Sequence, residues 1–199
     1  MSETPPLRTA AIVLAAGNST RMGAAKQLLE FRGKPLLRHA AESAQLSGCD
    51  PVIVVLGAHE RECRVALTGL AVEIVVNERW PEGMGTSIQA GLRAIVDRDA
   101  GGAILALADQ PFVTPGFLSG LIARHAESGK PIVAAQYSGT AGVPVFFARS
   151  AFPLLLALKP DQGCKGAILG NPADALLVDC PEAATDIDTP EDYARANSL

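Results

Sequence analysis

A loop near the N-terminus combines small residues with two basic side chains. Residues 14–26 (LAAGNSTRMGAAK) follow an apolar run and contain Arg21 and Lys26. Small residues allow backbone N–H groups to approach anionic oxygens, while Arg21 adds a planar guanidinium and Lys26 a mobile ammonium. The loop therefore predicts a binding site for a ligand that bears phosphate. The alternative is a tight strand-to-helix turn that carries two solvated cations.

The same loop lacks the signatures of two well-known nucleotide-binding turns. It contains no G-K-[ST] of a Walker A loop and no G-x-G-x-x-G of a dinucleotide-binding turn. A phosphate site at this loop must therefore use another geometry.

Three carboxylates stand where a divalent cation could be held. Asp109 directly follows the apolar run 103–108, and Asp186 and Asp188 belong to a D-I-D-T-P segment near the C-terminus. Magnesium takes hard oxygen ligands, typically carboxylates together with substrate phosphates. We therefore expect Asp109 to bind a metal together with one C-terminal aspartate. In the alternative, Asp109 caps the helix expected from residue 115, and the C-terminal pair forms an Asx-type turn.

A second glycine-containing segment, G-M-G-T-S, begins at Gly83. Gly83 and Gly85 would let a base or ribose lie against the backbone. A helix capped by Thr86 or Ser87 would offer its positive end to phosphate. The nearby Trp80 suits either stacking on a base or packing within the loop.

The histidines and cysteines form no catalytic or zinc-binding pattern. The histidines are His39, His59 and His125, and the cysteines are Cys49, Cys63, Cys164 and Cys180. The histidines fall in helical patterns without a serine or cysteine partner. The cysteines contain no C-x-x-C pair, so free thiols in a reducing compartment are expected.

Apolar runs that alternate with helical patterns would position these residues. Strands are expected at residues 10–15, 52–56, 72–76, 103–108, 132–136, 143–147 and 175–178. Helices are expected at residues 35–46, 58–67, 86–98, 115–128, 151–158 and 190–196. This alternation predicts right-handed βαβ units.

A single three-layer α/β/α domain with a mostly parallel sheet is expected over residues 1–199, with 1–9 flexible. Its buried strands suit a chain with 48% hydrophobic and only 5% aromatic residues. Ligands of such sheets bind beyond the carboxyl ends of the strands. The loop 14–26 and Asp109 are both expected at this edge.

Charge and hydropathy argue against binding to nucleic acid or membrane. The net charge is −4, which does not favour a nucleic-acid binder. No apolar run reaches the roughly 18–20 residues of a membrane span. Met1–Thr9 lacks the apolar core of a signal peptide. A cytoplasmic protein is therefore expected.

The first loop is part of a longer pattern that resembles a known family. L-A-A-G-x-S-x-R-M-G-x-x-K, continued by G-K-P-L-L-R-H at residues 33–39, is similar to the opening signature of the MobA-like nucleotidyltransferases. Later segments that resemble motifs of this family lie at residues 77–88, 108–111, 142–146, 161–165 and 186–192. The resemblance implies a Rossmann-like nucleotidyltransferase domain of the GT-A-like type.

The resemblance implies a role for each candidate residue. Arg21, Lys26 and Asp109 would be catalytic. The Mg²⁺ ligands would be Asp109 and, of the two C-terminal aspartates, Asp188. Nucleotide contacts are expected from Leu14, Ala15, Ala16, Gly17, Ser19, Arg21, Lys26, Gly83, Gly85 and Ser87.

Asp161 and Lys165 would contact the acceptor. Their segment has Cys164 and Lys165 where members of the family usually carry Ala and Arg. Lys165 keeps the charge but loses the bidentate geometry of Arg. Cys164 is expected to be an inert small side chain, with a reactive thiol beside Lys165 as the alternative.

The implied reaction transfers CMP from CTP to the terminal phosphate of a molybdopterin-type cofactor and releases pyrophosphate. The acceptor oxygen is already anionic, so positioning and charge neutralisation matter more than a base. CTP is favoured over GTP because the guanylyltransferases of this family usually have Gly at the position of Ala16. A molybdenum hydroxylase would receive the product.

Two other functions remain open. One is a transferase of the same fold that uses GTP or a sugar or polyol phosphate, although such relatives usually carry a longer insertion for the acceptor. The other is a non-catalytic nucleotide-binding chaperone for a cofactor, which would not need both metal carboxylates. Release of pyrophosphate distinguishes a transferase from a chaperone.

Overall fold

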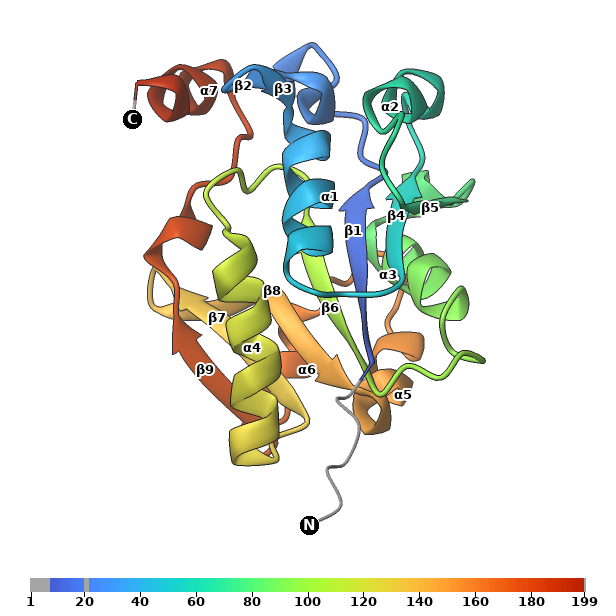
Figure 1. Cartoon of the computed structure of the whole chain (residues 1–199), viewed down its shortest axis with the longest axis vertical. Coiled ribbons are helices and arrows are strands. Elements are labelled where there is room, and N and C mark those ends of the chain that lie inside the picture. Colours follow the sequence, from blue (N-terminus) through green and yellow to red (C-terminus); the bar gives the residue numbers. More distant parts are fainter. Residues whose placement is uncertain (1–7, 20–21, 199) are drawn as a thin grey trace.

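The computed structural model describes residues 8–19 and 22–198, which form one seven-stranded sheet between two layers of helices (Figure 1). The predicted phosphate ligand Arg21 lies outside the described residues. The strand order is β5-β4-β1-β6-β8-β7-β9. These strands are β1 (Thr9–Ala15), β4 (Val52–Leu56), β5 (Glu73–Val76), β6 (Gly102–Leu107), β7 (Ile132–Tyr137), β8 (Thr140–Ala148) and β9 (Ala175–Asp179). A separate hairpin consists of β2 (Glu30–Phe31) and β3 (Lys34–Pro35).

Six strands of the sheet run in one direction and β8 runs in the other. β1 pairs in parallel with β4 and β6, whereas β8 is antiparallel to both β6 and β7. The prediction of a mostly parallel α/β/α sheet is therefore confirmed. Leu14 of β1 lies opposite Leu107 of β6. The first loop and Asp109 consequently leave the sheet at the same edge.

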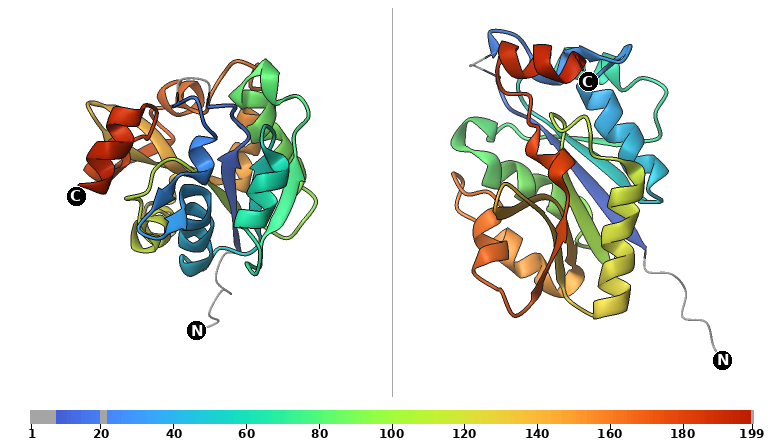
Figure 2. Two further views of the ribbon diagram at one scale, coloured as in Figure 1. Left: turned by 90° about the horizontal axis from the view of Figure 1, so that it is seen from above. Right: turned by 90° about the vertical axis from the view of Figure 1, so that its left-hand side faces the viewer.

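Helices cover both faces of the sheet (Figure 2). One face is covered by α1 (Leu36–Leu46), α2 (Glu60–Ala66) and α4 (Pro115–Ser128), and the other by α3 (Met84–Arg93), α5 (Phe152–Leu156) and α6 (Lys165–Leu169). The last helix, α7 (Pro190–Asn197), lies beyond the end of the sheet beside the hairpin. Short 3-10 helices occur at Lys26–Leu28, Trp80–Glu82, Arg149–Ala151 and Pro181–Ala184.

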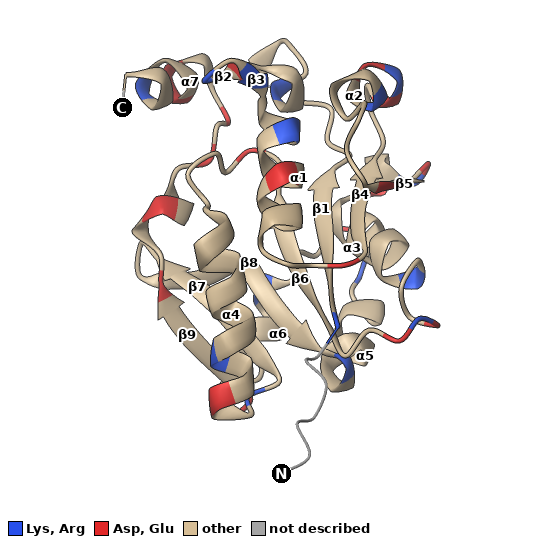
Figure 3. Ribbon diagram, viewed as in Figure 1, with Lys and Arg blue, Asp and Glu red and all other residues tan. Residues whose placement is uncertain are grey.

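The core forms on both sides of β1. Ala11 and Val13 point toward α1, while Ile12 and Leu14 point toward α3, so the strand is apolar on both faces. Strands β1, β4, β6, β7 and β8 contain no charged residue, and charges lie mainly on helices and loops (Figure 3). None of the described helices is long and apolar enough to cross a lipid bilayer.

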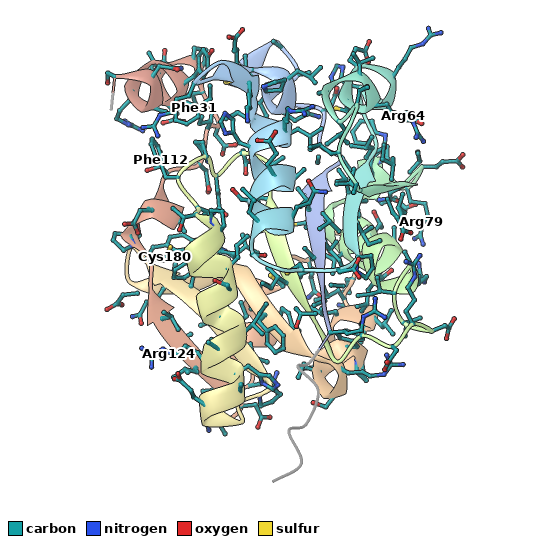
Figure 4. All side chains as sticks on the ribbon, in the orientation of Figure 1. Phe31, Arg64, Arg79, Phe112, Arg124 and Cys180 are labelled. Atoms are coloured by element: carbon teal, nitrogen blue, oxygen red, sulfur yellow. The ribbon has the colours of Figure 1, made fainter. Side chains whose placement is uncertain are left out.

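A third apolar cluster joins the hairpin to the C-terminal segment. Phe31 of β2 packs with Ile187 and with Ala196 of α7. The edge of the Phe31 ring meets Phe112 at a centroid distance of 5.5 Å (Figure 4). The Tyr193 hydroxyl donates to the Glu30 carbonyl at 2.5 Å. These contacts hold the D-I-D-T-P segment above the carboxyl ends of the strands.

Some predicted boundaries are wrong. Helix α3 begins at Met84, so Thr86 and Ser87 lie within its first turn and do not cap it. It ends at Arg93, before the predicted residue 98, because residues 94–97 continue as turns. Helix α1 begins after Pro35, which belongs to β3.

Two kinds of element have no counterpart in the sequence-based prediction. The hairpin strands contain two residues each and α6 contains five, too few for a hydrophobic period to appear. Helix α6 is stabilised by packing, since Ile168 is buried against the core.

Candidate active site

A pocket of about 430 Å³ lies at the carboxyl ends of β1 and β6. This volume is in the range of small-molecule sites, about 300–1,000 Å³. Predicted site residues that line it are Leu14, Ala15, Ala16, Gly17, Ser19, Lys26, Gly83, Ser87 and Asp109. The fold therefore brings the first loop, the start of α3 and the end of β6 to one pocket.

Gln27, which the sequence interpretation does not single out, holds the first loop in shape. Its side-chain amide donates to the carbonyls of Ala15 (3.3 Å) and Gly17 (3.0 Å). Its carbonyl oxygen accepts from the Ser19 hydroxyl at 3.0 Å. Ser19 in turn accepts from the backbone N–H of Lys26 at 3.1 Å. Gln27 is only 3% exposed, and its bond to the Ala15 carbonyl is buried, whereas its bonds to Gly17 and Ser19 are partly buried.

This clamp also orients the backbone donors of the loop. In a trans peptide the C=O and the following N–H point in opposite directions. With the Ala15 and Gly17 carbonyls turned toward Gln27, the N–H groups of Ala16 and Asn18 point away from it. Ala16 and Asn18 both line the pocket. Two backbone donors of this kind, two residues apart, suit an anionic oxygen.

Trp80 lines the pocket beside the first loop and is fixed by close packing. A Cβ atom at Gly57 would lie 2.6 Å from Trp80 Cγ and 2.8 Å from the Ala16 carbonyl oxygen. The Ala16 carbonyl accepts from Ala58 N–H at 3.0 Å. Trp80 therefore packs on Gly57 and also lines the pocket. The packing role predicted as one alternative is present, and the side chain can still contact a ligand.

The glycines at the start of α3 are required by a neighbouring segment of backbone. Gly83 has φ +127°, and a Cβ atom there would lie 2.4 Å from the Pro160 carbonyl oxygen. A Cβ atom at Gly85 would lie 2.2 Å from the Lys159 carbonyl oxygen. The Gly85 N–H donates to the Pro160 carbonyl at 2.9 Å. Gly85 is thus buried against this segment, while Gly83 also borders the pocket.

Asn77 fixes the first turn of α3 from the side. Its amide donates to the hydroxyls of Thr86 (2.8 Å) and Ser87 (2.9 Å), and all three residues are buried. The Thr86 hydroxyl donates to the carbonyl of Gly83 at 2.8 Å. The N-terminal turn of α3, with its positive end, is therefore held rigidly at the pocket.

Lys26 joins two carboxylates from distant parts of the chain. Its ammonium is paired with Asp109 Oδ2 and lies 2.7 Å from Asp188 Oδ1. The backbone N–H of Ile187 donates to the Asp109 carbonyl at 3.1 Å, which fixes the C-terminal segment beside β6. Asp188 therefore reaches the edge of the pocket through its contact with Lys26.

The charges of this cluster are shifted by burial and by one another. Burial alone lowers the pKa of Lys26, but Asp109 and then Asp188 outweigh it, so the pKa is raised above its ordinary value. Lys26 is consequently charged at neutral pH. Burial, followed by the Asp109 carboxylate, raises the pKa of Asp186. Asp186 thus lies in the same electrostatic cluster as the two carboxylates that contact Lys26.

The oxygens of this cluster fit a hard divalent cation. Asp109 Oδ1 is buried and has no hydrogen-bond partner among the described residues. Asp109 and Asp188 contact the same ammonium, so one cation can lie near both carboxylates. Within residues 8–19 and 22–198, no group of three or more His, Cys, Asp and Glu is placed to hold a metal. The remaining ligands would therefore be substrate oxygens and water, as is usual for Mg²⁺.

Helices α4 and α7 are capped by other residues, and the cap of α4 that the alternative interpretation assigned to Asp109 is not formed by it. The Thr114 hydroxyl accepts from Phe117 N–H and caps α4. Thr189 and Asp192 form a capping box at the start of α7. Asp109 and Asp188 are thus left to face Lys26.

Comparison with known proteins gives the family. The sequence model of the family described as the MobA-like NTP transferase domain matches residues 11–175 of this chain. These residues include the first loop, the start of α3 and Asp109. The chain belongs to the MobA-like NTP transferase family. The resemblance inferred from the sequence motifs is confirmed, and the chain is a nucleotidyltransferase-type enzyme.

Relatives of this MobA-like domain match along nearly its whole length. Nicotine blue oxidoreductase of Paenarthrobacter nicotinovorans is 32% identical over 92% of this chain and 94% of its own length. Purine catabolism protein PucB of Bacillus subtilis is 31% identical over 92% of both chains. Among solved structures, Rv0371c of Mycobacterium tuberculosis has a TM-score of 0.81 and 32% identity, covering 98% of this chain and 100% of that one. A manganese complex of Rv0371c has a TM-score of 0.76 and 30% identity, covering 96% and 98%.

The residues assigned to the acceptor lie outside the pocket at the carboxyl ends of β1 and β6. Asp161 is exposed, and its backbone packs against Gly83. Lys165 begins α6 and lines a separate groove of about 510 Å³ between α5 and α6. Met84 lines the pocket at the strand ends, and its sulfur lies near Gly163 of the groove. Their acceptor role stays a prediction.

The four cysteines are free thiols, as expected, and the structure shows that all four are buried. Burial raises the pKa of Cys164 to about 12, so this thiol is protonated at neutral pH. This agrees with an inert side chain at that position.

Proposed function

We propose that the protein transfers CMP from CTP to the terminal phosphate of a molybdopterin-type cofactor, releasing pyrophosphate in a Mg²⁺-dependent reaction. The observation that carries this proposal is the cluster of Lys26, Asp109 and Asp188 at the edge of the pocket. It combines a cation for phosphate with two carboxylates for a metal. Nucleotidyl transfer requires both.

Asp109 and Asp188 would hold the metal. When bound, Mg²⁺ neutralises phosphate charge and polarises the phosphorus that is attacked. The manganese complex of Rv0371c supports a divalent cation in this family. Asp186 stays the alternative second ligand, although it is Asp188 that shares a contact partner with Asp109.

The remaining elements of the pocket would bind the nucleotide. The N–H groups of Ala16 and Asn18, oriented by Gln27, can donate to phosphate oxygens. The positive end of α3 adds a favourable field. Arg21, if it acts as its motif implies, adds a guanidinium. These groups position the triphosphate and disperse its charge, and the anionic acceptor phosphate needs no base.

The choice of CTP rests on Ala16, which lines the pocket and is 6% exposed. Its methyl group occupies space that a purine would need. One methyl group changes selectivity modestly, by about 1–3 kcal/mol. GTP is therefore the alternative nucleotide, and a sugar or polyol phosphate the alternative acceptor.

The names of two relatives describe other activities. Nicotine blue oxidoreductase is named for redox chemistry, and PucB for purine catabolism. In this chain, the paired lysine and aspartates at a glycine-bearing loop support transfer between phosphates instead. A catalytically idle cofactor chaperone would not require this pair of carboxylates, but it would also bind a nucleotide.

The decisive experiment incubates the protein with each of the four NTPs, Mg²⁺ and molybdopterin. We expect pyrophosphate release with CTP and a product heavier than molybdopterin by one CMP unit. Mass spectrometry identifies the product. Binding of CTP without pyrophosphate would favour the chaperone, and a GMP adduct would replace the cytidylyl assignment.

A further inference from the structure

Lys26 occupies a position that serves two different partners. Its ammonium lies between Asp109 and Asp188, the carboxylates assigned above to the metal. The same side chain lines the pocket assigned to the triphosphate. Two of the three ammonium protons are used by the carboxylates, so Lys26 is engaged before any ligand binds.

A metal and the Lys26 ammonium would compete for these carboxylates. Both are cations, and Lys26 already holds Asp109 Oδ2 and Asp188 Oδ1, the oxygens of these carboxylates that lie nearest its ammonium. Their mutual repulsion is strong because the lysine side chain is only 21% exposed. A divalent cation therefore meets a site whose charge is already partly neutralised.

The surroundings allow the ammonium to move while the loop stays in place. The backbone N–H of Lys26 is held by Ser19, and the neighbouring Gln27 is buried and bonded to the loop. The lysine side chain has four rotatable bonds beyond this anchor. A triphosphate in the pocket offers it anionic oxygens without any shift of the backbone.

We propose that Lys26 is a resident cation that is exchanged for the metal when a nucleoside triphosphate binds. This inference rests on the metal site of the proposed function. Without nucleotide, Lys26 neutralises Asp109 and Asp188 and keeps metal binding weak. With nucleotide, the ammonium turns to the phosphates and both carboxylates become available.

The exchange makes the two ligands cooperative. The nucleotide raises the affinity for the metal, and by linkage the metal raises the affinity for the nucleotide by the same factor. The exchange of Lys26 for the metal would keep a free divalent cation from occupying the site before the nucleotide binds.

The test measures Mn²⁺ binding to the whole protein without nucleotide, from the loss of the free-ion paramagnetic resonance signal. Lys26→Met removes the charge and keeps the length of the side chain. We expect this variant to bind Mn²⁺ about tenfold more tightly than wild type, within the usual range of coupling between ligands. Lys34→Met is the matched control, because Lys34 pairs with Glu42 on the surface. It removes the same charge from the whole molecule and should bind Mn²⁺ like wild type.

Two further measurements complete the test. Lys26→Arg retains a cation and should bind Mn²⁺ as weakly as wild type, which shows that charge and not loop structure is responsible. Water-proton relaxation, which distinguishes Mn²⁺ on the protein from Mn²⁺ on free CTP, should show that CTP strengthens Mn²⁺ binding in wild type more than in Lys26→Met.

The outcomes separate this inference from the proposed function. Equal Mn²⁺ affinity of wild type and Lys26→Met without nucleotide overturns the exchange but leaves the metal site intact. If adding Asp109→Asn or Asp188→Asn to Lys26→Met does not weaken Mn²⁺ binding, the metal site itself is misassigned, and the exchange falls with it.

Discussion

Gln27 fixes the first loop through an amide whose orientation is set by three hydrogen bonds. Gln27→Glu keeps the shape but places an oxygen against the carbonyls of Ala15 and Gly17. A carbonyl that loses its hydrogen-bond donor away from water costs about 1–3 kcal/mol, which would disturb the shape of the loop. We therefore expect the KM for the triphosphate to rise about tenfold. Steady-state kinetics measure this change. Gln45→Glu is the control, since the carbonyl contact of Gln45 is exposed.

The same variant tests whether Gln27 acts on the phosphates. Affinity for cytidine, which lacks phosphate, should change much less than affinity for CTP. Equal losses for both ligands would contradict the assigned role and indicate a general loosening of the pocket.

The carboxylates that contact Lys26 give the second prediction. Asp109→Asn and Asp188→Asn each remove a charge while keeping the shape of the side chain. We expect kcat to fall about a hundredfold or more in each variant, because charge stabilisation in the transition state is lost. Asp99→Asn, at an exposed position, is the control. A larger loss for Asp186→Asn than for the Asp188 variant would transfer the metal role to Asp186.

Ala16 gives the third prediction, which concerns the base. Ala16→Gly removes the methyl group beside the pocket and should raise kcat/KM for GTP relative to CTP. The shift should be partial, about tenfold, because other loop residues also contact the base. The measurement compares both nucleotides in wild type and variant with saturating acceptor. A wild type that prefers GTP overturns the cytidylyl assignment, and an unchanged ratio refutes only this reason for it.

At the scale of elements, the start of α3 depends on its contact with residues 159–162. Gly85→Ala would bring a Cβ atom within 2.2 Å of the Lys159 carbonyl oxygen. Forced overpacking costs about 1–3 kcal/mol, so we expect the free energy of unfolding to fall by that amount. Urea denaturation measures it. Gly120→Ala, within α4 and without atoms near its Cβ, should instead stabilise by about 0.5–1 kcal/mol. Equal free energies of unfolding for wild type and Gly85→Ala would show that residues 159–162 can shift at little energetic cost.

This contact also shows what the sequence could and could not predict about an element. The glycines near α3 are recognisable as a place of close approach. The sequence favours a ligand as the approaching group, whereas the structure shows the backbone of Pro160. The partner is far away in the chain, and no local pattern identifies it. The same limit explains the wrong helix cap, because Asn77 holds Thr86 and Ser87 from outside the helix.

At the scale of the whole molecule, the layers follow from the apolar runs, but the order of the strands does not. The run of β8 is buried in either direction, but only Ser138 and Gly139 connect β7 to β8, too few for a parallel crossover. The reversal of β8 was therefore predictable, whereas its insertion between β6 and β7 was not. The gathering of Gly17, Lys26 and Asp109 was predictable, since ligands bind at strand ends. The position of Asp188 was not predictable from spacing, because it depends on the cluster of Phe31, Ile187 and α7.

The contact between the C-terminal segment and the first loop also bears on the order in which parts of the site form during folding. The bond from Ser19 to Gln27 closes over a separation of 8 residues, whereas that from Lys26 to Asp188 closes over 162. The entropic difference between closing these two loops is about 2–3 kcal/mol. During refolding, the shape that receives phosphate can therefore form early, while the carboxylate pair is completed only once the distant ends meet. A folding chain can therefore shape its first loop before α3, β6 and the C-terminal segment complete the site.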